Sequence, residues 1–161
     1  MEGAAFEQAV RPHLRRGAAY AASLLRERTE AEDAVQQATL QAWQKRAQFD
    51  GRRSFKTWWF AILRNHCLDE LRRRKRTPTA IDYDNAGLAS SADESAVDRL
   101  ALESAIARLP EIQREVLRLR YFADLTYQEL AQVLGIPEGT VMSRLHLARK
   151  ALALQLATED A

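Results

Sequence analysis

Apolar residues recur along the 161-residue chain at the three- and four-residue spacing of amphipathic helices. Such stripes begin at Phe6 and at Tyr20, and a longer one starts near Glu30. The sequence "FDGRRS", residues 49–54, interrupts this pattern, and a long helix capped by Ser54 is expected to follow it as far as Arg76. No run of alternating β-branched residues is bounded by turn residues, so the pattern predicts an all-α protein.

The C-terminal part of the chain predicts two helices joined by a tight turn. Thr126 and Glu129 have the spacing of a capping box, which starts the first helix. Gly135 suits the left-handed residue that ends a helix, and Pro137 and Glu138 suit the first turn of the next one. The second helix carries an apolar stripe of Val141, Leu145, Ala148 and Leu152. This pattern predicts a helix-turn-helix, and an ordinary helical hairpin remains the alternative.

The opposite face of that second helix is small, polar and basic. Counting 100° per residue from the stripe places on or beside this face Gly139, Thr140, Met142, Ser143, His146, Leu147, Arg149 and Lys150. A recognition helix presents such a face to the major groove of DNA. The pattern therefore favours duplex DNA binding by this helix.

Positive charge is concentrated in one block, although the formal net charge is only +2. Residues 52–76 carry nine basic and two acidic side chains, and the expected helix ends in five consecutive cations. One or two cations would complement the helix dipole, whereas five repel one another, which favours a phosphate-binding surface. Residues 77–98 carry five acidic and no basic residues and are rich in Ser, Asp and Ala, which predicts a flexible linker.

Two adjacent tryptophans precede the cations. Trp58 and Trp59 point about 100° apart on a helix, so one is expected in the core and the other near the surface. An exposed aromatic ring beside cations is the combination that stacks on unpaired bases. The sequence therefore places a second nucleic-acid surface in this part of the chain.

Several classes of protein fit the sequence poorly. The single Cys67 excludes an internal disulfide and suits a reducing cytosol, and no stretch approaches the roughly 18 apolar residues of a membrane span. His66 and Cys67 are neighbours on a helix and face different ways, so a catalytic Cys–His pair is not expected. We expect no enzyme activity, no metal and no cofactor, and a cytoplasmic location.

Two blocks of the sequence resemble bacterial RNA polymerase sigma factors of the extracytoplasmic-function (ECF) type. Residues 31–76, "AEDAVQQATLQAWQKRAQFDGRRSFKTWWFAILRNHCLDELRRRKR", resemble sigma region 2. Residues 109–152, "LPEIQREVLRLRYFADLTYQELAQVLGIPEGTVMSRLHLARKAL", resemble sigma region 4. The resemblance implies two small helical domains, region 2 in residues 1–76 and a region 4 helix-turn-helix in residues 99–161, joined by the linker 77–98.

The resemblance also implies a function and its site residues. Such a protein binds the RNA polymerase core and directs promoter-specific initiation by recognising the minus-10 and minus-35 elements and assisting strand opening. Polymerase contacts, with the clamp helices and the flap as the partner surfaces, would include Asp33, Gln36 and Gln37. The minus-10 candidates are Asp50, Gly51, Arg52, Arg53, Ser54, Trp58, Asn65, Arg72, Arg73, Arg74, Lys75 and Arg76. The minus-35 candidates are Thr140, Met142, Ser143, Arg144, His146, Leu147 and Lys150. Partners would be the polymerase core, promoter DNA and an anti-sigma factor, which nothing in the sequence identifies.

The chain departs from the family pattern at three positions. Gln37 stands where the family usually has an acidic residue, so the polymerase-binding face is less negative. Met142 and Leu147 stand where many members have arginine or lysine. Apolar side chains there could contact thymine methyl groups, so we expect minus-35 recognition that is weaker or differently specified.

A free-standing helix-turn-helix regulator is the alternative function. In that case the N-terminal domain would dimerise or bind a ligand. This alternative explains residues 126–152, but it does not explain why "FDGRRS" is followed by aromatic residues and five cations.

Overall fold

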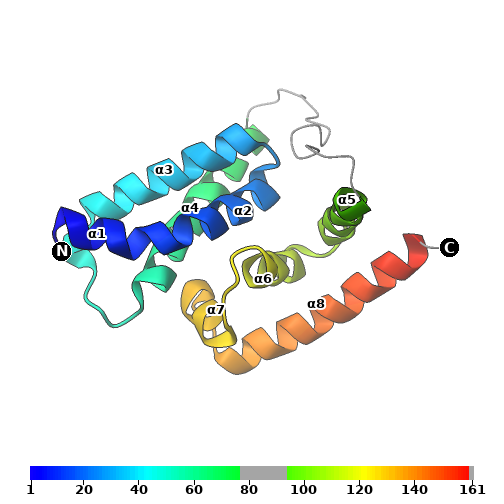
Figure 1. Ribbon diagram of the computed structural model, residues 1–161. Helices are drawn as coiled ribbons and strands as arrows, with labels where there is room; N and C mark the ends of the chain where they lie inside the picture. The colour runs from blue at the N-terminus through cyan, green and yellow to red at the C-terminus, as the bar shows by residue number, and fades with distance from the viewer. Residues whose placement is uncertain (77–93, 160–161) are drawn as a thin grey trace. The chain divides into compact units, whose positions relative to one another are not determined.

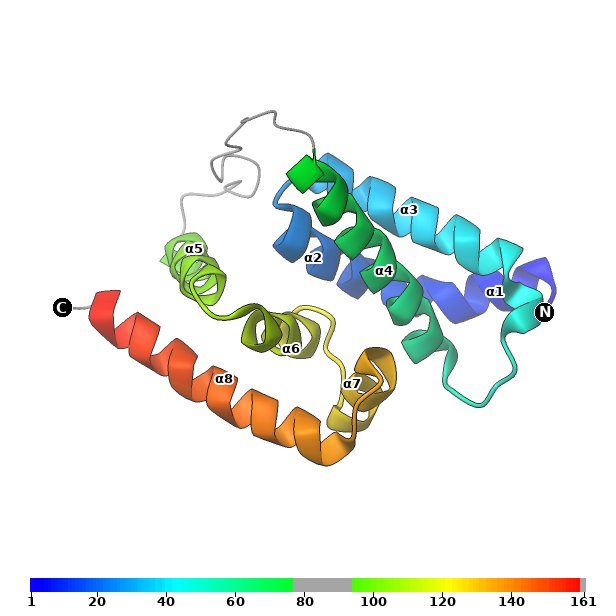
Figure 2. The same cartoon turned by 180° about the vertical axis from the view of Figure 1, so that it is seen from behind.

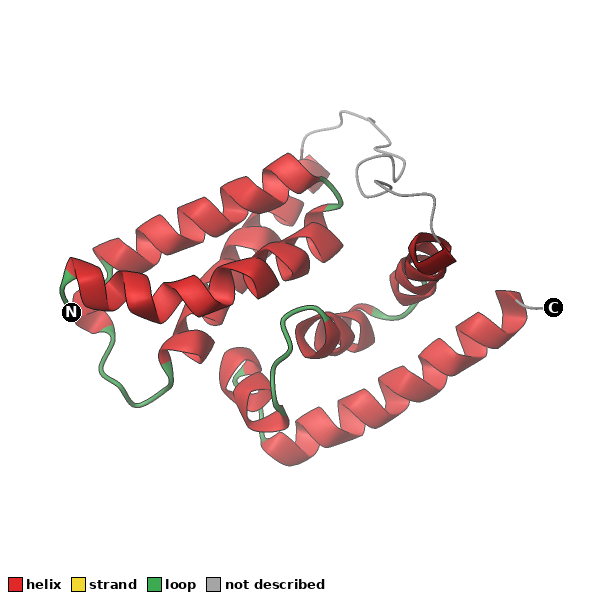
Figure 3. Ribbon diagram, viewed as in Figure 1, coloured by secondary structure: helices red, strands yellow, loops and turns green. Residues whose placement is uncertain are grey.

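The computed structural model describes residues 1–76 and 94–159, which form two separate compact units (Figure 1). Within these two ranges all regular structure is helical, as Figure 3 shows, so the predicted all-α class is confirmed. Residues 77–93, most of the predicted linker, lie outside the described residues. Helix α5 (Glu94–Ala107) begins within the last residues of the predicted linker. None of the described helices combines the length and the apolar character that a membrane crossing requires.

The first unit is a bundle of helices around one core. Its elements are α1 (Gly3–Val10), a 3-10 turn (Arg11–His13), α2 (Leu14–Leu25), α3 (Arg28–Gln44), a second 3-10 turn (Arg46–Gln48) and α4 (Phe55–Arg76). Helices α2, α3 and α4 pack against one another, and α1 packs against α4. Figure 2 shows α4 crossing the side of the bundle formed by α2 and α3.

Local capping explains where α3 and α4 begin. The side chain of Glu27 accepts hydrogen bonds from the backbone N–H groups of Thr29 and Glu30, at 3.2 and 3.0 Å. Helix α3 therefore starts slightly earlier than the apolar pattern indicates. The hydroxyl of Ser54 accepts a hydrogen bond from the N–H of Thr57 at 3.2 Å, which confirms Ser54 as the cap of α4.

Trp59 forms the centre of the first unit's core. Its side chain is fully buried, its ring packs edge-on against that of Phe60 with centroids 5.0 Å apart, and its indole N–H donates to the hydroxyl of Thr39 at 3.2 Å. Trp58 is only partly buried. The expectation that one of the two adjacent tryptophans is in the core and the other near the surface is therefore confirmed.

Gly17 is required where α2 meets the ring of Trp59. An added Cβ at this position would lie 2.7 Å from Trp59 Cζ3, far inside normal contact. We therefore expect Gly17→Ala to lower the free energy of unfolding by about 1–2 kcal/mol, because overpacking outweighs the gain of about 1 kcal/mol in helix propensity. All three tryptophans, at positions 43, 58 and 59, lie in the first unit, so tryptophan fluorescence follows its unfolding specifically.

Gly3→Ala is the matched control for this substitution. An added Cβ at Gly3 would meet only an ordinary contact, 3.8 Å from Trp43 Cη2. The control is therefore expected to leave the unfolding midpoint near that of the wild type. A Gly17→Ala protein at least as stable as the wild type would show that the ring of Trp59 does not pack on the backbone of α2.

The second unit contains α5, α6 (Glu111–Tyr121), α7 (Tyr127–Leu134) and α8 (Glu138–Glu159). Thr126 and Glu129 form the predicted capping box: the hydroxyl of Thr126 accepts from the N–H of Glu129, and the carboxylate of Glu129 accepts from the N–H of Thr126. Gly135 ends α7 with φ of 68°, as the sequence predicts. Helices α5, α6 and α7 all pack against α8, which therefore holds the unit together.

Candidate nucleic-acid interface

The solvent side of α8 carries most of the residues predicted to meet the minus-35 element. Val141, Leu145 and Ala148 are buried against the rest of the unit. Among the seven candidates, Met142, Ser143, His146, Leu147 and Lys150 are exposed, and Thr140 and Arg144 are half-buried. The structure therefore brings five of the seven to the exposed side of one helix, with the other two at its flanks.

A two-tyrosine clasp fixes α8 against the two preceding helices. Arg149 donates to the hydroxyl of Tyr121 at the end of α6, at 3.2 Å, and to the hydroxyl of Tyr127 at the start of α7, at 3.1 Å. These two hydrogen bonds raise the pKa of Arg149 above its ordinary value. Arg149 is thus held by its own unit. The clasp therefore links α8 to the end of α6 and to the start of α7.

The loop of residues 49–54 forms a small cavity in the first unit. The cavity has a volume of about 250 Å³ and is lined by Gln48, Phe49, Asp50, Arg52, Arg53 and Trp58. Asp50 shapes the loop, because its carboxylate accepts from the N–H of Arg52 at 2.9 Å and lies 3.4 Å from the guanidinium Nε of the same residue. Gly51 has φ of 78°, a left-handed conformation that favours glycine. Of the five predicted loop residues, the structure places Asp50, Arg52 and Arg53 around one opening with Trp58, whereas Gly51 and Ser54 do not line it.

A row of aromatic rings supports this cavity. We define the aromatic row as Trp43, Phe6, Phe55, Phe49 and Trp58. The ring centroids of Trp58 and Phe49 are 5.2 Å apart, those of Phe49 and Phe55 are 5.8 Å apart, and those of Phe55 and Phe6 are 5.6 Å apart. Phe6 in turn meets Trp43 at 5.2 Å. The ring of Trp58 is therefore held by packing instead of moving freely at the surface.

The five cations at the end of α4 do not form a uniform surface. Arg72 pairs with Asp69 at 3.0 Å, and Arg73 pairs with Glu70 at 2.7 Å. Arg74 is turned inward: it pairs with Glu30 and Glu70 and donates to the carbonyl oxygen of Leu25 at 3.0 Å. Lys75, Arg76 and the earlier candidate Asn65 are exposed. The structure therefore gives Arg74 a structural role, tying α4 to the turn between α2 and α3.

We expect Arg74→Ala to destabilise the first unit, because it removes a hydrogen bond to a main-chain carbonyl and leaves Glu30 without its cation. The loss should be about 2 kcal/mol, the scale of a charge-assisted hydrogen bond at a partly buried site. Chemical unfolding followed by tryptophan fluorescence measures it. Lys75→Ala removes the same charge from the next, exposed position and is expected to change the midpoint little. Equal effects of the two substitutions would contradict the structural role.

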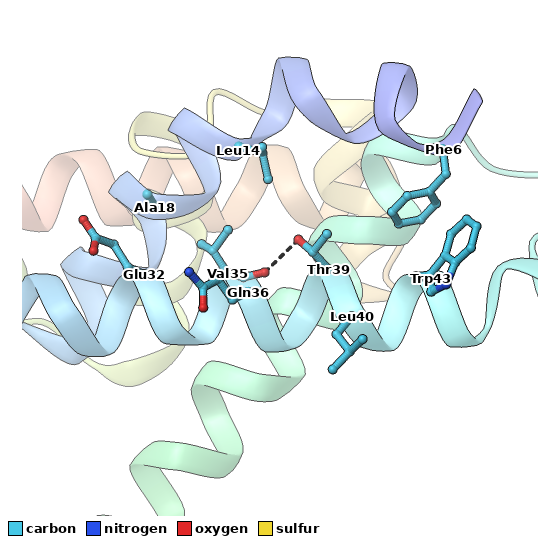
Figure 4. Close-up of a pocket in the computed structure, with 9 residues that line it drawn as sticks. All are labelled: Phe6, Leu14, Ala18, Glu32, Val35, Gln36, Thr39, Leu40 and Trp43. Atoms are coloured by element: carbon cyan, nitrogen blue, oxygen red, sulfur yellow. Dashed lines mark hydrogen bonds between the residues drawn. The ribbon is translucent and has the colours of Figure 1, made fainter. Parts of the chain in front are cut away.

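The predicted polymerase-binding residues lie on the exposed side of α3. Asp33, Gln36 and Gln37 are all exposed. Beside them, an apolar groove of about 610 Å³ runs between α3 and the α1–α2 segment. Figure 4 shows its walls, formed by Phe6, Leu14, Ala18, Glu32, Val35, Gln36, Thr39, Leu40 and Trp43. Leu40, one of the residues that line the groove, is 50% exposed, so its side chain is accessible to a partner.

Cys67 and His66 do not form a reactive pair. Burial raises the pKa of the Cys67 thiol to about 12, with a further contribution from the charge of Glu70. The thiol therefore stays protonated and is a poor nucleophile at neutral pH. The Nε2 atom of His66 instead lies 2.5 Å from the side-chain oxygen of Gln41 on α3.

Comparisons with known proteins match both units. The sigma-70 region 2 family model matches residues 9–77, and the sigma-70 region 4 family model matches residues 99–152. The ECF RNA polymerase sigma factor RpoE of Cereibacter sphaeroides is 40% identical over 124 residues, which are 74% of this chain and 68% of that protein. The chain belongs to the ECF RNA polymerase sigma factors. Another ECF sigma factor, SigL of Mycobacterium tuberculosis, is 37% identical over 142 residues, which are 85% of this chain and 80% of that protein.

Solved structures agree with this membership. The sigma factor RpoE of Bartonella quintana, in complex with the anti-sigma factor NepR, has a TM-score of 0.77 and 30% identity, and the match covers 96% of this chain and 98% of that one. CnrH, in complex with the cytosolic domain of CnrY, has a TM-score of 0.75 and 27% identity, with 96% and 89% covered. As an ECF sigma factor, the chain binds the RNA polymerase core and directs promoter-specific initiation by recognising minus-10 and minus-35 elements and assisting strand opening. Hereafter the first unit is called region 2 and the second region 4.

Three features of this ECF sigma factor could not be predicted from local sequence. They are the inward turn of Arg74, the Arg149 clasp and the place of Phe6 in the aromatic row. Each depends on contacts between residues far apart in the chain. A weak signal existed only for the clasp, because Tyr127 at the first position of a capped helix is a large residue with few local partners.

Proposed function

We propose that this ECF sigma factor recognises its promoter through two separate surfaces, one on each unit. On region 2, the loop cavity takes an extruded base of the minus-10 element against the ring of Trp58, and Arg52 and Arg53 meet the adjoining phosphates. On region 4, the exposed face of α8 contacts the edges of the minus-35 bases around Ser143 and His146. The cations Lys75 and Arg76 add contacts to the DNA backbone.

The energetics of opening favour this division. Taking a base out of the stack costs a few kcal/mol. Stacking it on an aromatic ring returns about 1–3 kcal/mol, and the nearby guanidinium groups add attraction to the phosphates. Neither surface needs to bind strongly alone, because the polymerase holds both and makes the second contact intramolecular.

The polymerase-binding surface is the exposed side of α3 together with the apolar groove. Gln36 belongs to both, so the groove continues the face that Asp33 and Gln37 form. A groove of this kind suits apolar side chains of a partner helix, with polar contacts around the rim. The occupant we propose is the RNA polymerase core.

The observation that carries this proposal is the loop cavity of about 250 Å³, which the aromatic rings of Phe49 and Trp58 line together with Arg52 and Arg53. Run-off transcription with purified core polymerase over a random promoter library tests it. Arg52→Ala with Arg53→Ala should lower initiation across the library and reduce its salt dependence without changing base preference, because these residues contact phosphates. Ser143→Ala with His146→Ala should change base preference only at the upstream element. A protein that joins the polymerase without conferring start-site selectivity would refute the proposal.

The free-standing regulator gives a different result. That class of protein binds a specific duplex tightly without polymerase, so a gel shift with the isolated chain distinguishes the two. We expect only weak, salt-sensitive binding, because the isolated protein has no means to hold both surfaces at the promoter spacing.

The same reasoning extends to partners and location. The two similar solved structures each hold a further protein, the anti-sigma factor NepR in one and the CnrY domain in the other. We propose that an anti-sigma factor likewise binds this chain and competes with the polymerase. The protein acts in the cytoplasm as a binding protein without catalysis, consistent with the protonated, buried thiol of Cys67.

A further inference from the structure

Two large apolar side chains stand on the exposed face of α8. Met142 and Leu147 are each 55% exposed. They lie on either side of Ser143 and His146, because positions 142 and 147 are about 140° apart around a helix. Neither is needed for packing, since Val141, Leu145 and Ala148 already fill the inner side of this segment. The polar centre of the recognition face is therefore flanked by apolar groups on both sides.

The chemistry of the major groove determines what such flanks can recognise. The thymine methyl group is the apolar feature that base edges present there, whereas guanine offers two acceptors and cytosine a donor. The side chains of Met142 and Leu147 supply no strong donor or acceptor. Placed against a guanine or cytosine edge, they would displace water from polar atoms without replacing its hydrogen bonds, which is unfavourable. Placed against a methyl group, they bury apolar area on both partners.

The polar centre between them is also defined. The hydroxyl of Ser143 donates to the carbonyl oxygen of Gly139, one turn earlier, at 3.1 Å. Its proton is therefore engaged inside the helix, and the oxygen faces the solvent as an acceptor. An acceptor here fits the amino group of adenine or cytosine, and it does not supply the donor that a guanine edge requires.

On the basis of the proposed minus-35 role of α8, we propose that Met142 and Leu147 are specificity-determining residues that contact thymine methyl groups. The five-residue separation corresponds to a rise of about 7.5 Å, which spans roughly two base-pair steps. The two thymines therefore flank the part of the element that Ser143 and His146 contact. This chain selects a minus-35 element with A·T pairs at both flanks.

Single methyl deletion in the DNA tests this proposal. The holoenzyme, made from the full chain and core polymerase, first selects its promoter from the random library. Each thymine of the minus-35 element, on either strand, is then replaced in turn by deoxyuridine, which removes only the methyl group. We expect open-complex formation to fall about fourfold at each of two positions, the effect of exposing one buried methyl-sized group.

Substitutions in the protein assign each position. In the Met142→Ala holoenzyme, deoxyuridine should no longer reduce open-complex formation at one of the two thymine positions. In the Leu147→Ala holoenzyme, it should no longer do so at the other position. Leu154→Ala is the matched control: Leu154 is 64% exposed on the same helix, two turns beyond Leu147, and its loss should preserve both effects. All three residues are largely exposed, so these variants are expected to fold.

The possible failures are distinguishable. A selected minus-35 element with G·C pairs at both flanks, or one in which deoxyuridine has no effect anywhere, overturns the role of Met142 and Leu147 while the proposed function stands. The same conclusion follows if both alanine variants keep the wild-type response to deoxyuridine. A holoenzyme that selects start sites without any upstream preference refutes the minus-35 role of α8 itself, and the present inference with it.

Discussion

Replacing Trp58 with alanine is expected to reduce initiation from a double-stranded promoter by about 10- to 100-fold, the loss that corresponds to one base–aromatic stacking contact. The ring lines the loop cavity and is held at a fixed place by Phe49 and Phe55. It is thus already positioned when a base leaves the duplex. Assembly with core polymerase should be nearly unchanged, because Trp58 does not line the groove beside α3. Single-round transcription measures the first quantity, and titration of core polymerase the second.

A double-mutant cycle with the DNA separates stacking from a general defect. An abasic nucleotide placed at each position of the minus-10 element in turn removes one base at a time. At the extruded position, wild type and Trp58→Ala should become equally active, and Trp58→Phe should retain most activity on the intact promoter. A Trp58→Ala defect that stays the same on every abasic template would show that the ring does not stack on a base. The fluorescence of the buried Trp59 reports whether region 2 still folds.

Replacing Leu40 with aspartate is expected to weaken assembly with core polymerase by at least tenfold. Leu40 is half exposed and lines the apolar groove next to Gln36, so a charge there would be placed against the apolar side chains of the partner. Burying an unpaired carboxylate in a desolvated apolar interface costs several kcal/mol, which exceeds the roughly 1.4 kcal/mol of a tenfold change in affinity. The affinity can be measured by fluorescence anisotropy of a labelled holoenzyme in competition with unlabelled variants.

Gln44→Asp is the control for Leu40→Asp. Gln44 is exposed one turn further along α3 and does not line the groove. Gln44→Asp therefore introduces the same negative charge near the groove but not within it. This variant should assemble with an affinity near that of the wild type. If both substitutions weakened polymerase affinity equally, the cause would be charge repulsion along the exposed side of α3, and not the loss of an apolar contact in the groove. No weakening by either would remove the groove from the polymerase interface.

Helices and turns with strong local signals could be predicted from the sequence. The helix-turn-helix is the clearest case, because Thr126, Glu129 and Gly135 each specify backbone geometry through residues a few positions away. The apolar stripe of α8 likewise identified its buried side, and Val141, Leu145 and Ala148 are indeed buried. The start of α3 was predicted less accurately, near Glu30 instead of Arg28. Glutamate is not a favoured N-cap residue, so the sequence did not indicate that Glu27 caps this helix.

The interactions between distant residues could not be predicted. In the sequence the five cations of residues 72–76 look alike, and only the packing of α4 beside the end of α2 distinguishes Arg74 from its neighbours. Its partner carbonyl, on Leu25, is 49 residues away. The same holds for Arg149 and Tyr121, which are 28 residues apart. Local periodicity shows which side of a helix is buried, but it does not show which charged residue will find a partner there.

The place of Phe6 affects how region 2 can be isolated as a fragment. The family match begins at residue 9, and a fragment designed from it would lack Phe6 and most of α1. The edges of Trp43 and Phe55, whose ring centroids lie 5.2 and 5.6 Å from that of Phe6, would then be uncovered. Such a fragment would expose an aromatic surface that favours non-specific association. Its loop of residues 49–54 would also be less constrained, because Phe55 would lose its contact with Phe6. Promoter affinities measured with it would therefore not represent intact region 2, and fragments of this protein should retain Phe6 and the whole of α1.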